Sequence, residues 1–148
     1  MVYHSKFTQV VAAICGIIIG CVVLSSLYAS SSLTLIYLGL IDSDLHSNGW
    51  LLIIVYGCFL YCCRVMYLFV RFFRTITGKI SYNSENVYFE LGNKSQTFEW
   101  KDLINSKAHA DCQIFCLFDN DKRHIFSIWE LANGYKEFRE SFIVANGT

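Results

Sequence analysis

The chain has 148 residues, of which 54% are apolar and 16% are charged, and its mean hydropathy is +0.39. This average is too apolar for an ordinary soluble domain of this length, so we expect much of the apolar surface to lie in a membrane. The net charge is zero, and basic residues alternate with acidic ones without forming a patch, which argues against nucleic acid as a partner.

Charge divides the chain into two parts. The first 70 residues contain only four charged residues, Lys6, Asp42, Asp44 and Arg64. We therefore predict a transmembrane hairpin in residues 1–78 and a small cytosolic domain in residues 79–148. Five of the seven cysteines lie in the apolar part, where they behave as small hydrophobic residues, so no disulfide framework is expected.

The first apolar stretch, residues 7–41, contains no charge. About 20 helical residues cross a hydrocarbon core of about 30 Å, so the stretch is too long for one upright span. Its most polar part, the serine-rich run at 25–32, favours a first span at 10–28 with a tilted or interfacial extension to residue 41. A span nearer 20–41 is the alternative. The stretch is longer than a signal-peptide core and lacks a clear cleavage site, so we expect it to remain uncleaved.

The second span is predicted at residues 50–73. Trp50 stands near one end of it, and Arg71 and Arg74 stand near the other, as expected for side chains at the two membrane interfaces. We expect these three residues and Lys79 to lie at the membrane surface.

The connection between the two spans, residues 42–49, carries two acids and no lysine or arginine. Lys6 precedes the first span, and three basic residues follow the second. The positive-inside bias therefore predicts that both termini are cytoplasmic. A connection this short makes the two spans antiparallel neighbours.

Small residues recur every four positions in the first span, at Ala12, Gly16 and Gly20. Such a face lets another helix approach closely in lipid, where no hydrophobic effect drives helices together. The face is predicted to pack either on the protein's own second span or on a partner, which would be a second copy or another membrane protein.

Arg64 lies seven residues before Arg71, which places it about 10 Å deeper than the inner interface on a helix. An unpaired guanidinium there costs on the order of 3 kcal/mol. Arg64 is therefore expected either to extend its side chain toward the interface or to pair with an acceptor on a partner.

After Gly78 the pattern changes to short alternating segments separated by turn residues. Strands are predicted at 80–83, 87–91, 96–100, 106–111, 113–118 and 124–127. This part of the chain is therefore expected to be mainly β-sheet.

A closing helix is predicted to end near residue 144. Apolar residues recur at helical spacing at Leu131, Tyr135, Phe138 and Phe142. Two starts remain open, because Ser127 and Glu130 would form a capping box for a start near 129, whereas Asn133-Gly134 suits a later one. Asn146-Gly147 is a usual helix stop. Strands followed by one amphipathic helix indicate an α+β domain in which the helix covers an antiparallel sheet.

The segment Phe98-Glu99-Trp100-Lys101-Asp102-Leu103-Ile104 lies between an early hairpin and a later strand pair with an Asp-rich turn. This order of elements, over about residues 80–144, resembles the bacterial pleckstrin-homology-like (PH-like) domains, in which a Trp-x-Asp-Ile/Leu element joins the third strand to the next. Such domains are often attached to a transmembrane hairpin. The resemblance implies a PH-like fold in a bacterial inner membrane, but the family has several functions and fixes none of them.

Four residues are candidates for a metal or nucleophile site: His109, Asp111, Cys112 and Cys116. On one strand, His109 and Asp111 share one face and the two cysteines share the other, which does not assemble a tetrahedral site. The sequence also lacks a phosphate-binding glycine loop, a Gly-x-Ser-x-Gly elbow and a His-Glu-x-x-His pair. We expect no metal, no cofactor and no enzymatic activity.

The expected function is therefore binding. Two spans with one cytosolic domain are typical of accessory subunits of membrane complexes and of immunity proteins that protect a bacterium from pore-forming toxins. The predicted partners are the lipid bilayer and either another membrane protein or a second copy of the chain. The alternative is lipid or membrane-surface sensing, with Arg71, Arg74 and Lys79 against anionic headgroups.

Overall fold

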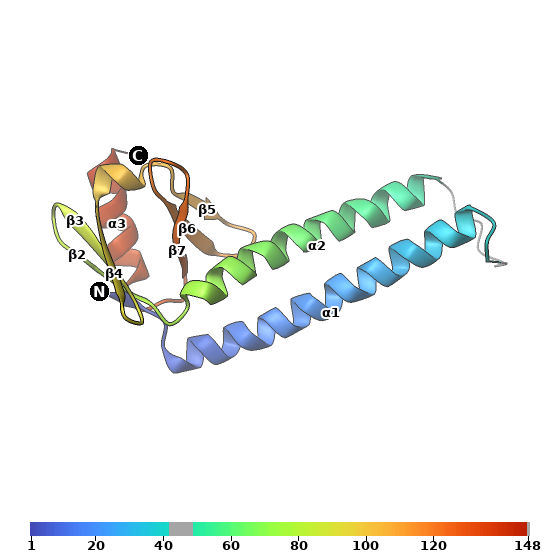
Figure 1. Ribbon diagram of the computed structural model, residues 1–148, viewed down its shortest axis with the longest axis horizontal. Coiled ribbons are helices and arrows are strands. Elements are labelled where there is room, and N and C mark those ends of the chain that lie inside the picture. The colour runs from blue at the N-terminus through green and yellow to red at the C-terminus, as the bar shows by residue number, and fades with distance from the viewer. Residues whose placement is uncertain (42–48, 148) are drawn as a thin grey trace. The chain divides into compact units, whose positions relative to one another are not determined.

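The computed structural model describes residues 1–41 and 49–147 of the chain. Two long apolar helices are followed by two antiparallel sheets and a C-terminal helix (Figure 1), which confirms the predicted α+β class with a candidate membrane hairpin. Two compact units are present. One comprises Met1–Ala12 together with Leu68–Thr148, and the other comprises Ala13–Tyr67. The acidic connection between the predicted spans lies mostly at residues 42–48, outside the described residues.

Both long helices have the length and composition needed to cross a membrane. Helix α1 (Lys6–Tyr37) has 32 residues and α2 (Gly49–Thr75) has 27, which correspond to lengths of about 48 and 40 Å. Their most apolar windows have mean hydropathies of 2.7 and 2.0. Each helix therefore exceeds a hydrocarbon core of about 30 Å, and α2 contains the whole of the predicted second span, residues 50–73.

The serine-rich run does not interrupt α1. The hydroxyl groups of Ser26, Ser30, Ser31 and Thr34 donate hydrogen bonds of 2.7–2.9 Å to backbone carbonyls three or four residues earlier in the helix. These bonds satisfy the hydroxyls within the helix, so the run is compatible with an apolar environment. The single helix therefore contains the span predicted at 10–28 and part of the alternative at 20–41, and it ends four residues before Ile41.

The strands form two sheets. Their bounds are β1 (Val2–Tyr3), β2 (Lys79–Tyr82), β3 (Asn86–Leu91), β4 (Lys94–Glu99), β5 (Lys107–His109), β6 (Ile114–Phe118) and β7 (His124–Trp129). The first sheet has the order β1-β2-β3-β4 and the second has the order β5-β6-β7, and every pairing is antiparallel. All six predicted strands are present, with the strand predicted at 106–111 shortened because residues 110–113 form a turn.

Strand β1 precedes both long helices but belongs to the sheet that follows them. Val2 pairs with Ile80 and Tyr3 pairs with Lys79. The Val2 side chain is only 1% exposed and belongs to the hydrophobic core of the domain. The compact unit thus contains residues from before α1, whereas the domain predicted from the sequence comprised only residues 79–148.

A second contact fixes β1 in place. The backbone groups of Tyr3 and Asn133 exchange hydrogen bonds of 3.3 and 3.1 Å. Gly134 follows with a φ of +75°, and a Cβ there would lie about 2.5 Å from the carbonyl oxygen of Met1. Only glycine fits both the left-handed backbone and this close approach.

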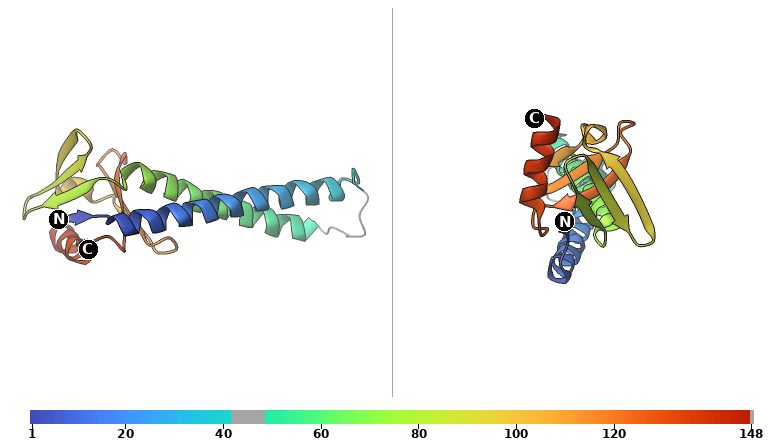
Figure 2. Two further views of the ribbon diagram at one scale, coloured as in Figure 1. Left: turned by 90° about the horizontal axis from the view of Figure 1, so that it is seen from below. Right: turned by 90° about the vertical axis from the view of Figure 1, so that its left-hand side faces the viewer.

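Helix α3 (Tyr135–Asn146) packs against both sheets (Figure 2). The Phe138 ring contacts Tyr82 of the first sheet and Phe115 of the second, at centroid distances of 5.4 and 6.5 Å. The helix begins at the later of the two predicted starts, because Ser127 is part of β7 and Gly134 occupies the N-cap position. It ends at Asn146, two residues beyond the predicted end near 144 and at the Asn146-Gly147 stop, where the Gly147 N–H donates to the carbonyl of Ile143.

Candidate functional site

Helix α1 carries small residues at Ala12, Gly16 and Gly20, and there is empty space beside the last of them. Ala12 is buried, whereas Gly16 and Gly20 are half-buried. A Cβ placed on Gly20 would meet no atom within 4 Å. Within its own unit, the helix is therefore not closely packed at Gly20, and room remains there for another helix.

The predicted interfacial residues occupy different environments. Trp50, at the start of α2, is 77% exposed, and Arg64 is also exposed. Arg74 and Lys79 are exposed, but Arg71 is half-buried, with its guanidinium carbon 5.7 Å from the centroid of the Phe118 ring. The last turns of α2 therefore belong to the folded domain, and Arg71 packs on one of its strands.

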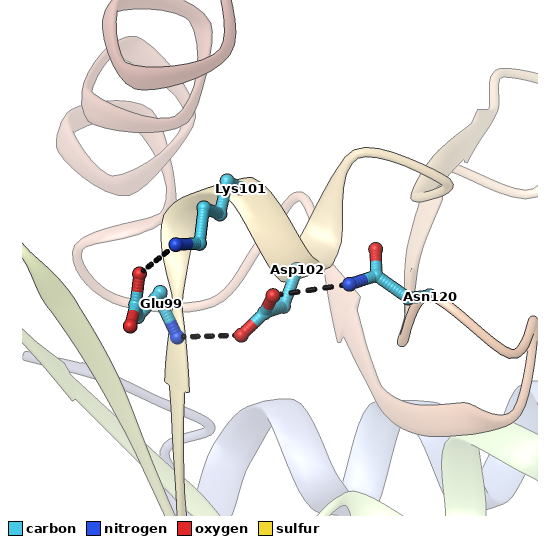
Figure 3. A network of polar contacts seen from close by, with 4 residues as sticks. All are labelled: Glu99, Lys101, Asp102 and Asn120. Atoms are coloured by element: carbon cyan, nitrogen blue, oxygen red, sulfur yellow. Dashed lines mark hydrogen bonds and ion pairs between the residues drawn. The ribbon is translucent and has the colours of Figure 1, made fainter.

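The element that carries the family resemblance forms a short 3-10 helix, η1 (Trp100–Leu103). Figure 3 shows that Asp102 connects two parts of the domain, because its carboxylate accepts the Glu99 backbone N–H at 3.3 Å and the Asn120 side-chain N–H at 3.0 Å. Lys101 pairs with Glu99 at 2.7 Å, and this pair raises the pKa of the lysine. The network thus ties η1 to the turn between β6 and β7.

Burial lowers the pKa of two histidines in the domain, His4 and His124. His124 Nε2 lies 2.7 Å from Ser127 Oγ, which is in turn 3.4 Å from Cys116 Sγ. Burial, and then the charges of Arg71 and Arg74, lower the pKa of His124 to about 4. Ser127 has no exposed surface, so no substrate could reach this hydroxyl.

His4 is buried, and no pattern in the sequence indicates a role for it. Its Nε2 accepts the backbone N–H of Trp129 at 3.2 Å, and Thr75 Oγ1 accepts the N–H of Ser127 at 3.1 Å. Strand β7 is the last strand of its sheet, so these side chains satisfy donors on its free edge. A residue just before α1 and the last residue of α2 therefore hold the same strand. Val2-Tyr3-His4 is too short a segment for periodicity to reveal this role.

The four residues weighed as a metal site are not brought together. His109 ends β5, Asp111 and Cys112 lie in the following turn, and Cys116 is buried in β6. Among residues 1–41 and 49–147 there is no group of three histidine, cysteine or acidic side chains arranged to hold a metal ion.

The described part of the domain surface includes a larger and a smaller hollow. The larger has a volume of about 610 Å³ and lies between α3, η1 and the turn joining β2 to β3. The smaller, of about 270 Å³, is lined by Asn105, Lys107, Phe118 and Lys122. Sequence patterns could not identify the larger hollow, because its lining residues come from segments that are distant in the chain.

No protein-family model, no curated protein and no solved structure matches the chain.

Proposed function

We propose that this chain is a non-catalytic membrane protein that acts by binding another membrane protein, as an accessory subunit of a membrane complex or as an immunity protein against a pore-forming toxin. The proposed location is a bacterial inner membrane, and the proposed type of domain is PH-like. The two sheets, the closing helix and the tethered Trp-x-Asp-Leu element at residues 100–103 support the PH-like assignment.

The pairing of β1 with β2 supports a membrane orientation. Residues before α1 and residues after α2 belong to one folded sheet, so they must lie on the same side of a membrane that both helices cross. Lys6, Arg71, Arg74 and Lys79 flank these helix ends, and a positive flank is typical of the cytoplasmic side. We therefore infer that both termini are cytoplasmic.

The observation that carries the binding proposal is the open position at Gly20. A glycine in an apolar helix with no atom within 4 Å of its added Cβ leaves room for a second helix to approach the backbone. Close approach is the main source of helix association in lipid, because apolar side chains gain nothing by leaving apolar surroundings there. A partner helix that approaches α1 at Gly20 would use this room.

The Gly20→Leu substitution tests the proposal. We expect at least a tenfold loss of the partner recovered with the full chain in mild detergent, because a leucine side chain would hold the two helix backbones apart. Recovery would be measured by quantitative mass spectrometry, and a second copy of the chain would be detected by crosslinking differently tagged copies.

Gly57 provides a matched control, since a Cβ there also meets no atom within 4 Å but lies on α2. Gly57→Leu should retain the partner. Equal recovery with the wild type, Gly20→Leu and Gly57→Leu would exclude the small-residue face as the binding surface.

The smaller hollow favours lipid sensing as a second candidate function. It places Lys107 and Lys122 beside Phe118, the ring on which Arg71 packs. The two lysines beside this aromatic ring would attract the phosphate of an anionic headgroup.

If the domain senses lipid, anionic lipids should protect the backbone around the smaller hollow from hydrogen exchange. With the full chain in nanodiscs, phosphatidylserine should slow hydrogen exchange at residues 105–122 relative to phosphatidylcholine alone, and Lys107→Gln/Lys122→Gln should remove most of this difference. Lys94→Gln/Lys136→Gln removes two other exposed lysines and should preserve it. Exchange that is indifferent to lipid charge in the wild type would eliminate this candidate.

A further inference from the structure

The larger hollow is a groove with an aromatic floor. Tyr82 and Trp100 form the floor, with ring centroids 5.8 Å apart, and Phe138 of α3 packs beneath them at 5.4 and 5.5 Å. Trp100 is only 5% exposed, so its ring is fixed by the core on one side and lines the groove on the other. The floor is therefore apolar and rigid.

One wall of the groove is a turn that is held in a single conformation. The Asn83 side-chain oxygen accepts the backbone N–H groups of Glu85 and Asn86 at 2.9 and 2.7 Å. The Asn83 carbonyl accepts the indole N–H of Trp100 at 2.9 Å, which joins the wall to the floor. A ligand would lose little free energy in ordering this wall, because the turn is already ordered.

The opposite wall is one face of α3, and it carries negative charge. Glu137 and Glu140 line the groove together with Val144, which is 83% exposed. No basic residue lines the groove, and the nearby Arg139 is directed elsewhere, with its guanidinium carbon 4.5 Å from the centroid of the Phe115 ring. Within the described part of the chain, neither glutamate has an ion pair with a lysine or arginine.

These observations define the chemistry of the occupant. An apolar floor and an exposed valine favour an apolar side chain, and two carboxylates without an ion pair favour a cation beside it. Lysine and arginine next to apolar residues are what the cytoplasmic end of a transmembrane helix presents. The same composition would disfavour an acidic segment, whose charge would face Glu137 and Glu140.

We propose that the groove between α3 and the β2–β3 turn binds a lysine- or arginine-bearing apolar segment that flanks a transmembrane helix of the partner. This inference rests on the proposed function and adds the chemistry of the segment that the cytosolic domain recognises. The helix face at Gly20 and this groove would then be two separate contacts with one partner, one in lipid and one in water.

The test uses the full chain in phosphatidylcholine nanodiscs and a fluorescent peptide of alternating lysine and leucine residues. Fluorescence anisotropy should show saturable binding to the wild type, corrected for binding to empty nanodiscs. Glu137→Gln/Glu140→Gln should weaken binding about tenfold, since it removes two partly exposed charge pairs while preserving side-chain volume. Val144→Ser should also weaken binding by removing the exposed apolar contact.

Glu90→Gln is the control, because Glu90 is an exposed carboxylate on β3 that does not line the groove. It should bind the peptide as the wild type does. A peptide in which glutamate replaces lysine should not bind. Equal peptide affinity for the wild type and Glu137→Gln/Glu140→Gln, or no saturable binding at all, would overturn the proposal.

A second copy is the competing occupant. If it filled the groove, the wild type would be a dimer that Glu137→Gln/Glu140→Gln dissociates and that the peptide does not compete with, and this result would overturn the proposal. The test is independent of the helix contact. Loss of partner with Gly20→Leu together with unaltered peptide binding in Glu137→Gln/Glu140→Gln would refute the groove and leave the proposed function standing.

Discussion

Val2→Asp is expected to destabilise the folded domain by about 3 to 5 kcal/mol, although Val2 is 77 residues away from the strand that follows it in the sheet. Its side chain is 1% exposed and lies in the same core cluster as Ile80 and Phe138. A carboxylate there would lose its hydration without gaining a partner, so the chain must either protonate the carboxyl group or release β1 from the sheet. Urea unfolding of the full chain in a mild detergent, followed by tryptophan fluorescence, measures the effect.

Tyr3→Asp is the matched control, because Tyr3 is in the same strand but its side chain is 42% exposed. It introduces the same charge one residue away, and its cost should be less than about 1 kcal/mol. Equal unfolding midpoints for Val2→Asp and the wild type would show that β1 does not contribute to the domain core.

Acid should destabilise the domain through His4, by on the order of 3 kcal/mol between pH 6.5 and pH 4. Burial lowers the pKa of His4 from 6.5 to about 4, and a hydrogen bond to the Ile76 backbone only partly offsets this effect. The unfolded chain therefore binds a proton on His4 as the pH falls through 6.5, whereas the folded chain binds this proton only near pH 4. The contribution of neutral His4 to the free energy of unfolding is fully present above pH 6.5 and is lost as the pH falls to 4.

The hydrogen bonding of His4 explains why its protonation is unfavourable in the folded chain. His4 Nε2 accepts the Trp129 backbone N–H, and a proton on that nitrogen would replace an acceptor with a second donor. His4→Gln keeps a side chain that can accept this hydrogen bond but does not titrate. Its free energy of unfolding, measured by urea titration at several pH values, should depend less on pH than that of the wild type.

His124 must be separated from His4 in this measurement. Its pKa is also lowered to about 4, but it is half-buried, so solvent reduces its contribution. His124→Gln should therefore flatten the pH dependence less than His4→Gln does. Wild-type and His4→Gln curves that run parallel from pH 7 to pH 4 would contradict the role assigned to His4.

The interaction surfaces differ in how visible they are in the sequence. The Ala12/Gly16/Gly20 spacing is visible because the residues of one helix face recur at a fixed interval. The groove is not, because Tyr82, Trp100 and Glu137 belong to three elements that meet only when the domain folds. In the sequence, Glu137 and Glu140 look like part of an ordinary solvated helix face. Only the structure shows that they line a groove and that Arg139, next to Glu140, lies over the Phe115 ring.

The sequence by itself determined the elements whose cause is local. Long uncharged runs predict the two apolar helices, alternation predicts the six strands after residue 78, and Asn146-Gly147 predicts the end of α3. The tertiary structure alone decided that Val2 and Tyr3 complete the first sheet and that His4 and Thr75 satisfy the edge of β7. A strand of two residues is too short to show periodicity. It is separated from β2, its partner in the sheet, by 75 residues, so only folding in three dimensions brings the two strands together.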